Sequence, residues 1–146
     1  MDKYKVILVD DEAEVIDVIE QKIAWNELGF KVVGSATNGV KALELVEKTQ
    51  PDVVITDIKM PYMDGLELSK RLNDDYRNIH IIIFTGFDEF EYAKEAVHLE
   101  VEEYMLKPIN SDELTECLKR VKNSLDLERE EKLNVQKLEN YFNDVL

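Results

Sequence analysis

Short apolar runs and longer amphipathic segments alternate along the sequence, five of each. The apolar runs are rich in Val and Ile, which is typical of strands that a parallel sheet buries on both faces. The segments between them repeat apolar residues at helical spacing. This alternation predicts an α/β fold, in which right-handed crossovers place helices on both faces of a parallel sheet. The expected strands are 5–9, 30–36, 53–57, 79–84 and 102–106, and the expected helices are 12–24, 38–49, 64–73, 89–99 and 110–125.

The predicted sheet is complete by residue 125, although the chain has 146 residues. We therefore expect one domain over 1–125 and a helical extension over 126–146, which contains neither glycine nor proline. An isolated helix of this length is marginal in water, so the extension should continue the last domain helix and pack its apolar side against something. Two interpretations stay open: a solvated tail, or a linker to an output domain beyond Leu146.

Composition argues against several classes of protein. The formal net charge of −14 disfavours direct binding of nucleic acid or of an anionic membrane by this segment. Cys117 is the single cysteine, so an intrachain disulfide is impossible and a reducing compartment is favoured. The first apolar run, 6–9, is too short for a signal peptide or a membrane span, which predicts a cytoplasmic protein. His80 and His98 have no metal-ligand partner at usable spacing, and we interpret both as structural.

Polar side chains stand where four of the predicted strands end. Asp10 and Asp11 follow the first strand, Asp57 ends the third, Thr85 follows the fourth and Lys107 follows the fifth. Because the carboxyl ends of parallel strands meet at one edge of a sheet, we expect these side chains to lie together. Each has an ordinary interpretation alone, such as a helix N-terminus for the acidic pair. Their convergence favours a functional site.

The residue types at this edge are those that phosphoryl transfer needs. Clustered carboxylates repel one another, and oxygen ligands without His or Cys favour Mg²⁺, or Mn²⁺, over zinc. An aspartate can attack phosphorus and form an aspartyl phosphate. The ammonium of Lys107 would neutralise charge on the phosphoryl group, and the hydroxyl of Thr85 would donate a hydrogen bond to it.

At these positions the chain resembles the receiver domains of bacterial two-component response regulators. The resemblance covers about residues 3–125 and implies a flavodoxin-like, doubly wound sheet with the strand order 2-1-3-4-5. The matching motifs are VDDE at 9–12, DIKMP at 57–61, MDG at 63–65, TG at 85–86 and YMLKP at 104–108.

The resemblance assigns the chemistry to named residues. Asp57 would be the phosphoacceptor and would receive its phosphoryl group from a sensor histidine kinase. Asp10 or Asp11, together with Asp57 and the main-chain carbonyl of Lys59, would bind Mg²⁺. Lys107 would contact the phosphoryl group. The domain would catalyse its own phosphorylation and dephosphorylation without being an enzyme that acts on a separate substrate.

The resemblance also implies a switch. Thr85 would contact the phosphoryl group, Tyr104 would change position with it, and the Lys107–Pro108 peptide bond would be cis. The responding face would run from the fourth helix through the fifth strand to the fifth helix, where we expect a symmetric homodimer promoted by phosphorylation. The output would be control of transcription.

Two features bear on the subfamily. Glu100 stands where receivers often have glycine. The connection over 25–30 is longer than in a minimal receiver, and together with 87–93 it resembles receivers that precede AraC-type helix-turn-helix output domains.

Three other functions compete with this interpretation. A haloacid-dehalogenase-type phosphatase would need a second aspartate two residues after Asp57, where Lys59 stands. A flavodoxin-like electron carrier would need a hydroxyl- or glycine-rich phosphate loop where the acidic residues 10–12 stand. A receiver-like interaction module without phosphorylation would not need the complete set of site residues.

Overall fold

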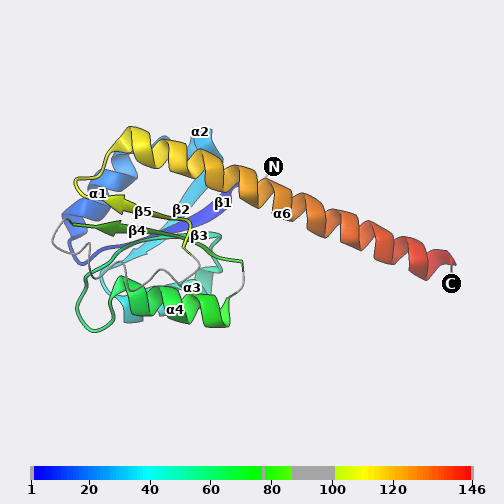
Figure 1. Cartoon of the computed structure of the whole chain (residues 1–146), viewed down its shortest axis with the longest axis horizontal. Coiled ribbons are helices and arrows are strands. Elements are labelled where there is room, and N and C mark those ends of the chain that lie inside the picture. The colour runs from blue at the N-terminus through cyan, green and yellow to red at the C-terminus, as the bar shows by residue number, and fades with distance from the viewer. Residues whose placement is uncertain (1, 77, 87–100, 146) are drawn as a thin grey trace.

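The computed structural model describes residues 2–76, 78–86 and 101–145, which form a sheet with helices on both faces and one long helix that leaves it (Figure 1). The five strands are parallel and lie in the order β2-β1-β3-β4-β5, which confirms the predicted flavodoxin-like fold. The strands are β1 Tyr4–Val9, β2 Phe30–Ala36, β3 Val53–Asp57, β4 His80–Thr85 and β5 Glu103–Leu106. The helices are α1 Ala13–Lys22, α2 Trp25–Leu28, α3 Gly39–Thr49, α4 Gly65–Asp75 and α6 Ser111–Val145.

The sheet separates two hydrophobic cores. Helices α1, α2 and α6 lie on one side of it, and α3 and α4 lie on the other (Figure 1). Successive residues of the central strand point to opposite faces, so Ile55 belongs to the core under α1 and α6 and Val54 to the core under α3 and α4. Every residue of β3 is buried, as its uninterrupted apolar run predicts.

Polar side chains cap three helices close to the carboxyl ends of strands. Asn38 caps α3 and Asp64 caps α4, each by accepting a hydrogen bond from a main-chain amide three residues later. The side-chain oxygen of Asn110 accepts from the amides of Asp112 and Glu113, at 2.9 and 3.1 Å, as the predicted cap requires. These caps start the helices close to one edge of the sheet.

The first helix is shorter than predicted. It ends at Lys22, Ile23 is extended, and a separate turn of helix, α2, follows before Gly29. The indole of Trp25 donates to the carbonyl of Glu20 at 3.1 Å, and Gly29 has a positive φ of 90° that allows the turn into β2. Periodicity missed the break because buried Ile23 continues the apolar stripe of α1.

Some expectations concern residues outside the described ranges. The predicted helix 89–99, the segment 87–93, Glu100 and His98 all fall there. In the described part of the chain, no helix is both long and apolar enough to cross a membrane.

Helix α6 continues without a break from the domain into the extension, as predicted. Its first half packs on the sheet with a buried stripe that includes Leu114, Val121 and Leu125. Cys117 belongs to this stripe and is 1% exposed, which confirms it as a core residue. From Glu130 to Val145, in contrast, every residue is exposed.

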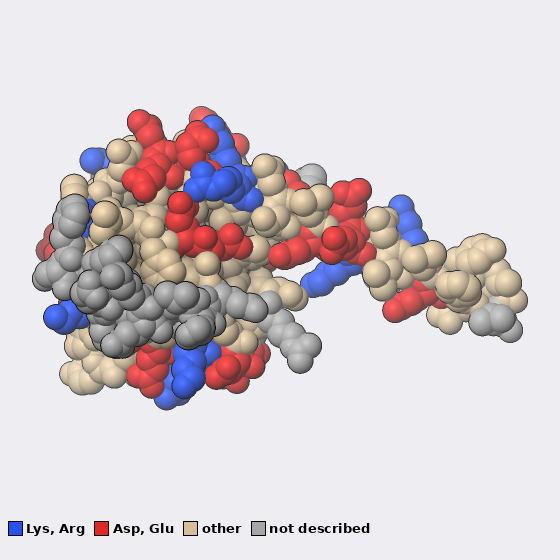
Figure 2. Space-filling model, in the orientation of Figure 1, with Lys and Arg blue, Asp and Glu red and all other residues tan. Residues whose placement is uncertain are grey.

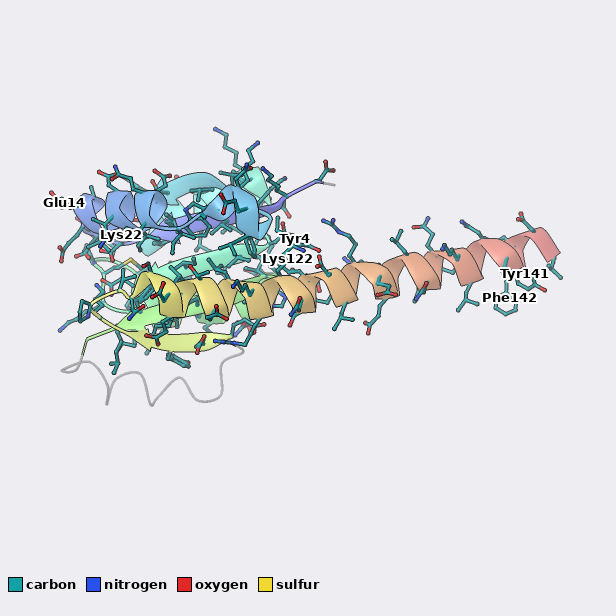
Figure 3. All side chains as sticks on the ribbon, turned by 90° about the horizontal axis from the view of Figure 1, so that it is seen from above. Tyr4, Glu14, Lys22, Lys122, Tyr141 and Phe142 are labelled. Atoms are coloured by element: carbon teal, nitrogen blue, oxygen red, sulfur yellow. The ribbon has the colours of Figure 1, made fainter. Side chains whose placement is uncertain are left out.

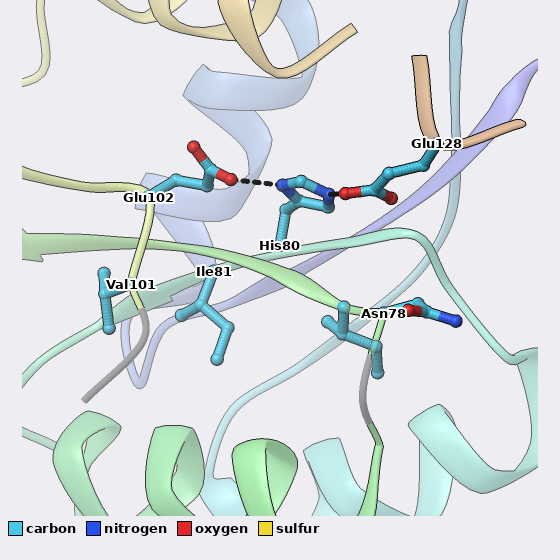
Figure 4. A pocket seen from close by; sticks show the side chains of 7 residues that line it. Asn78, His80, Ile81, Val101, Glu102 and Glu128 are labelled. Carbon is cyan, nitrogen blue, oxygen red and sulfur yellow. Dashed lines mark hydrogen bonds and ion pairs between the residues drawn. The ribbon is translucent and has the colours of Figure 1, made fainter. Parts of the chain in front are cut away.

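Two contacts join α6 to the edge of the sheet where the strands begin, which we call the amino edge. The first is made by His80, at the start of β4. Its ring lies between the carboxylates of Glu102 and Glu128, which approach it from two sides (Figure 4). Nε2 is 3.0 Å from Glu128 of α6, and Nδ1 faces Glu102, just before β5. This pairing connects the sheet to α6 beyond residue 125.

A second contact lies at the start of β1. The Tyr4 hydroxyl donates to Asp126 of α6 at 2.5 Å, and the guanidinium of Arg129 lies 4.5 Å from the centre of the Tyr4 ring. Asp126 also accepts from the ammonium of Lys122 at 2.8 Å. Burial and the hydrogen bond to Asp126 raise the pKa of Tyr4 to about 12. We call the residues of both contacts the amino-edge cluster: Tyr4, His80, Glu102, Lys122, Asp126, Glu128 and Arg129.

Candidate functional site

The fold brings the acidic strand ends together. Asp10 and Asp11 follow β1, and Asp57 is the last residue of the adjacent strand β3. One carboxylate oxygen from each of the three residues lies within 4.8 Å of the others. Lys107, just after β5, places Nζ 3.0 Å from Asp57 Oδ1 and 3.5 Å from Asp10 Oδ2. Four predicted site residues therefore form one cluster, the carboxyl-edge cluster.

The cluster combines burial with an excess of negative charge. Asp10 and Asp57 are 3% and 5% exposed, whereas Asp11 is open to solvent. Burial raises the pKa of Asp10 to about 6; the charge of Asp57 adds to this rise, while the Glu12 amide and Lys107 oppose it. Three carboxylates with one ammonium make a site that a cation would stabilise.

Lys107 is kept charged by its neighbours. Partial burial acts to lower its pKa, but the hydrogen bond and charge of Asp57 and the charge of Asp10 outweigh burial, so the pKa is raised. The lysine therefore stays an ammonium against the buried carboxylates. Such a point charge can follow a ligand that binds beside Asp57.

The turn after β3 is folded tightly around Asp57. The amide of Ile58 donates to Asp57 Oδ1 at 2.9 Å, and the amide of Gly65 donates to the carbonyl of Ile58 at 2.7 Å. A Cβ atom at Gly65 would lie 2.3 Å from the main-chain oxygen of Asp57, so only glycine fits there. The sequence indicated a turn at Gly65, but nothing local showed this close approach.

Thr85 lies at the same edge of the sheet. Its side chain is buried, its hydroxyl donates to the carbonyl of Gly86 at 2.9 Å, and its own carbonyl accepts from the Lys107 amide at 2.8 Å. Tyr104 pairs with Ile83 across β4 and β5, so Tyr104 and Thr85 share one face of the sheet. Burial raises the pKa of Tyr104.

Two further expected features lie in the connecting turns. The Lys107–Pro108 peptide bond is cis. Lys59 is in the turn between β3 and α4, two residues beyond Asp57, with its side chain exposed. The role of its carbonyl as a ligand stays a prediction.

The arrangement suits a hard divalent cation beside a nucleophilic carboxylate. All candidate ligand side chains are oxygen donors, and no other acidic, His or Cys group in the described ranges has this metal-binding geometry. Mg²⁺ prefers such donors and keeps open positions for phosphate oxygens. Without a cation the three carboxylates would repel a phosphate.

Comparison with known proteins places the chain in a family. The family described as response regulator receiver domain matches residues 6–119. The uncharacterized transcriptional regulatory protein YesN of Bacillus subtilis (strain 168) is 43% identical over 118 residues, 81% of this chain and 32% of YesN. The transcriptional regulatory protein HptR of Staphylococcus aureus (strain NCTC 8325 / PS 47) is 37% identical over 123 residues, 84% of this chain and 48% of HptR. The chain thus spans between about a third and a half of the length of these relatives.

Solved structures agree with this placement. The REC domain of AraT, a response regulator from Geobacillus stearothermophilus, is 43% identical with a TM-score of 0.83, over 86% of this chain and 98% of that one. A two component transcriptional regulator AraC from Clostridium phytofermentans ISDg is 30% identical with a TM-score of 0.81, over 87% of this chain and 98% of that one. These neighbours fit the AraC-type subfamily suggested by the sequence. The chain belongs to the response regulator receiver domain family.

Proposed function

We propose that this chain is a phosphorylation-dependent signal receiver in which Asp57 accepts a phosphoryl group from a sensor histidine kinase. The observation that carries the proposal is the 3.0 Å contact between buried Asp57 and the ammonium of Lys107 inside an acidic cluster. The carboxylate and the ammonium meet at the end of a central strand, in a chain that belongs to the response regulator receiver domain family.

The chain's own residues would carry the transfer. An oxygen of Asp57 forms a bond to phosphorus as the bond from phosphorus to the histidine nitrogen of the kinase breaks, and the electron pair leaves with the imidazole. Lys107, already within reach, neutralises charge on the phosphoryl oxygens. The Thr85 hydroxyl turns from the Gly86 carbonyl to a phosphoryl oxygen.

Asp10, Asp11, Asp57 and the carbonyl of Lys59 would hold Mg²⁺, with Mn²⁺ as a substitute. The fit is supported by the three oxygen donors within 4.8 Å of one another and by their net negative charge. When bound, the ion neutralises charge on the transferred group and orients it.

Tyr104 would transmit the change at the phosphorylation site to the surface of the domain. A turn of Thr85 toward the phosphoryl group opens space on the face that both residues share, and Tyr104 moves inward. We expect a symmetric dimer in response, through a face that includes β5 and α6; the predicted helix 89–99, also expected there, lies outside the described residues. The output is transcription, through an AraC-type DNA-binding domain in the rest of a longer cytoplasmic protein, as the names and lengths of the relatives suggest.

Intact-mass measurement with acetyl phosphate and Mg²⁺ tests the chemistry. Wild type should gain one phosphoryl group, and Asp57→Asn and EDTA-treated protein should gain none. Asp74→Asn, an exposed change on α4, is the matched control and should behave as wild type. Equal phosphorylation of Asp57→Asn would overturn the assignment. Absence of phosphorylation in wild type would favour a receiver-like interaction module.

A further inference from the structure

Large apolar side chains are exposed along the free half of α6. They are 54–63% exposed, whereas in the described domain five large apolar residues are exposed and the others are buried or half-buried. At about 100° per residue, all but Leu133 fall within roughly a third of the helix circumference. We call this surface the apolar arc: Leu127, Val135, Leu138, Tyr141, Phe142 and Val145.

The arc does not continue the stripe that packs on the sheet. The centre of the arc lies roughly 115° around the helix from the centre of the buried stripe, and only its edge residue Val135 falls on the line of buried Cys117. Beside the domain, the same line of α6 carries exposed Glu116 and Arg120. Figure 2 shows charged side chains on the segment near the domain and uncharged ones gathered at its far end. Along the centre of the arc the helix is therefore polar where it adjoins its own domain, and mostly apolar beyond it.

The direction of the arc is set by the amino-edge cluster. Asp126 and Glu128 attach α6 to Tyr4 and His80 at the point where the helix leaves the sheet. Beyond this point 16 helical residues project roughly 24 Å, and Figure 3 places Tyr141 and Phe142 far from the strands. The domain's own sheet therefore leaves the far end of the arc uncovered.

The spacing along the arc is that of a coiled-coil seam. Positions 127, 131, 134, 138, 141 and 145 alternate steps of four and three, which is the a/d pattern of a 3.5-residue repeat. Four of these six positions are apolar, and the other two are Glu131 and Asn134. A helix of this kind gains most of its stability from a second helix against the seam.

We propose that a second copy of this chain covers the arc, so that two α6 extensions form a parallel coiled coil. Asn134 favours an identical helix as the partner, because its side-chain amide has both a donor and an acceptor. It can therefore form hydrogen bonds with the Asn134 amide of a second copy at the same level of the coiled coil. An apolar partner would leave the amide unsatisfied. A parallel, in-register pair brings the two Asn134 side chains together and also sets each apolar seam residue against its own copy, whereas an antiparallel pair centred on Asn134 would set Leu138 against Glu130 and Val145 against Asn123.

Glu131 limits the strength of the pairing. In the same register it meets its own copy one turn before Asn134, and like charges in a seam oppose association. Because of this repulsion we expect a coiled coil of only moderate stability. This inference does not depend on phosphorylation of Asp57.

Sedimentation equilibrium of the whole chain, over a range of concentrations, tests the seam. Glu131→Leu should lower the dimer Kd at least tenfold, and Leu138→Lys should raise it at least tenfold. Gln136→Leu, on the opposite side of α6, is the matched control and should leave Kd unchanged. Circular dichroism should show that each variant keeps the helix. A monomer at all concentrations, or a Kd that Glu131→Leu does not lower, overturns the proposal.

Disulfide cross-linking tests the orientation. Leu138→Cys and Val145→Cys should each form a covalent dimer under mild oxidation, whereas Gln136→Cys should not. Native Cys117 is buried and should not interfere. An antiparallel pair could cross-link at no more than one of the two seam positions, and that result would contradict the parallel register.

Discussion

The two edges of the sheet are both polar, but their charges are arranged in opposite ways. At the carboxyl edge, Asp10, Asp11 and Asp57 lie together beside the ammonium of Lys107. At the amino edge, the acids lie beside hydrogen-bonding partners: Asp126 accepts from Lys122 and Tyr4, and the His80 ring lies between Glu102 and Glu128. An excess of buried charge lowers the stability of a protein and is typical of sites where a ligand binds, whereas acids that accept hydrogen bonds from their neighbours stabilise a contact. The difference marks one edge as a binding site and the other as an attachment for α6.

The largest effect should follow removal of the Lys107 ammonium from the carboxyl edge. Lys107→Met removes the ammonium beside two buried carboxylates, which should lower the free energy of unfolding by about 2–3 kcal/mol at pH 7.5 without divalent ions. Urea unfolding measures this loss. Lys119→Met removes an exposed ion pair with Glu116 and should cost less than about 0.5 kcal/mol. Equal losses in the two variants would show that Lys107 is an ordinary surface lysine.

Removing an acid at the same edge should have the opposite sign. Asp10→Asn should stabilise the metal-free protein by about 1–2 kcal/mol at pH 7.5, because it removes a buried negative charge beside Asp57. The folded pKa of Asp10, about 6, lies above its ordinary value of 3.8, so its ionisation opposes folding increasingly as pH rises from 4 through 6. The gain should therefore fall to about a third in urea unfolding at pH 4.5 and vanish near pH 3. Destabilisation at pH 7.5 would refute the charge-excess interpretation.

The matched substitution at the amino edge should destabilise. Hydrogen bonds from Lys122 and Tyr4 lower the pKa of Asp126, so its contribution is present above the ordinary pKa of 3.8 and is lost as pH falls through the lower folded value. Because Asp126 is partly exposed, Asp126→Asn should cost only about 0.5–1 kcal/mol at pH 7.5 and progressively less toward pH 3. A gain like that of Asp10→Asn would mean that the two edges do not differ.

Much of the molecule could be predicted from local sequence. Apolar periodicity predicted the strands to within one residue at most ends, because burial of a strand depends on its own side chains. The alternation of strands and helices implied a parallel sheet. This placed Asp10, Asp57 and Lys107 at one edge, since every strand of such a sheet ends there. The strand order itself came from the resemblance to receivers, not from periodicity.

Other features depend on residues that are distant in the chain. Tyr4 and Asp126 are 122 positions apart, and His80 and Glu128 are 48 apart, so no local pattern pairs them. The break after α1 needed the Trp25 contact, because helix propensity and apolar spacing both favoured continuation.

By itself, the sequence determined the alternating elements, the polar strand ends and the repeat in the extension, because each follows from spacing along one segment. Only the tertiary structure decided which charges are paired, how closely Gly65 approaches Asp57, and which way the apolar arc faces. Those depend on the packing of α6 against the sheet, and a small rotation of that helix would change every contact at the amino edge.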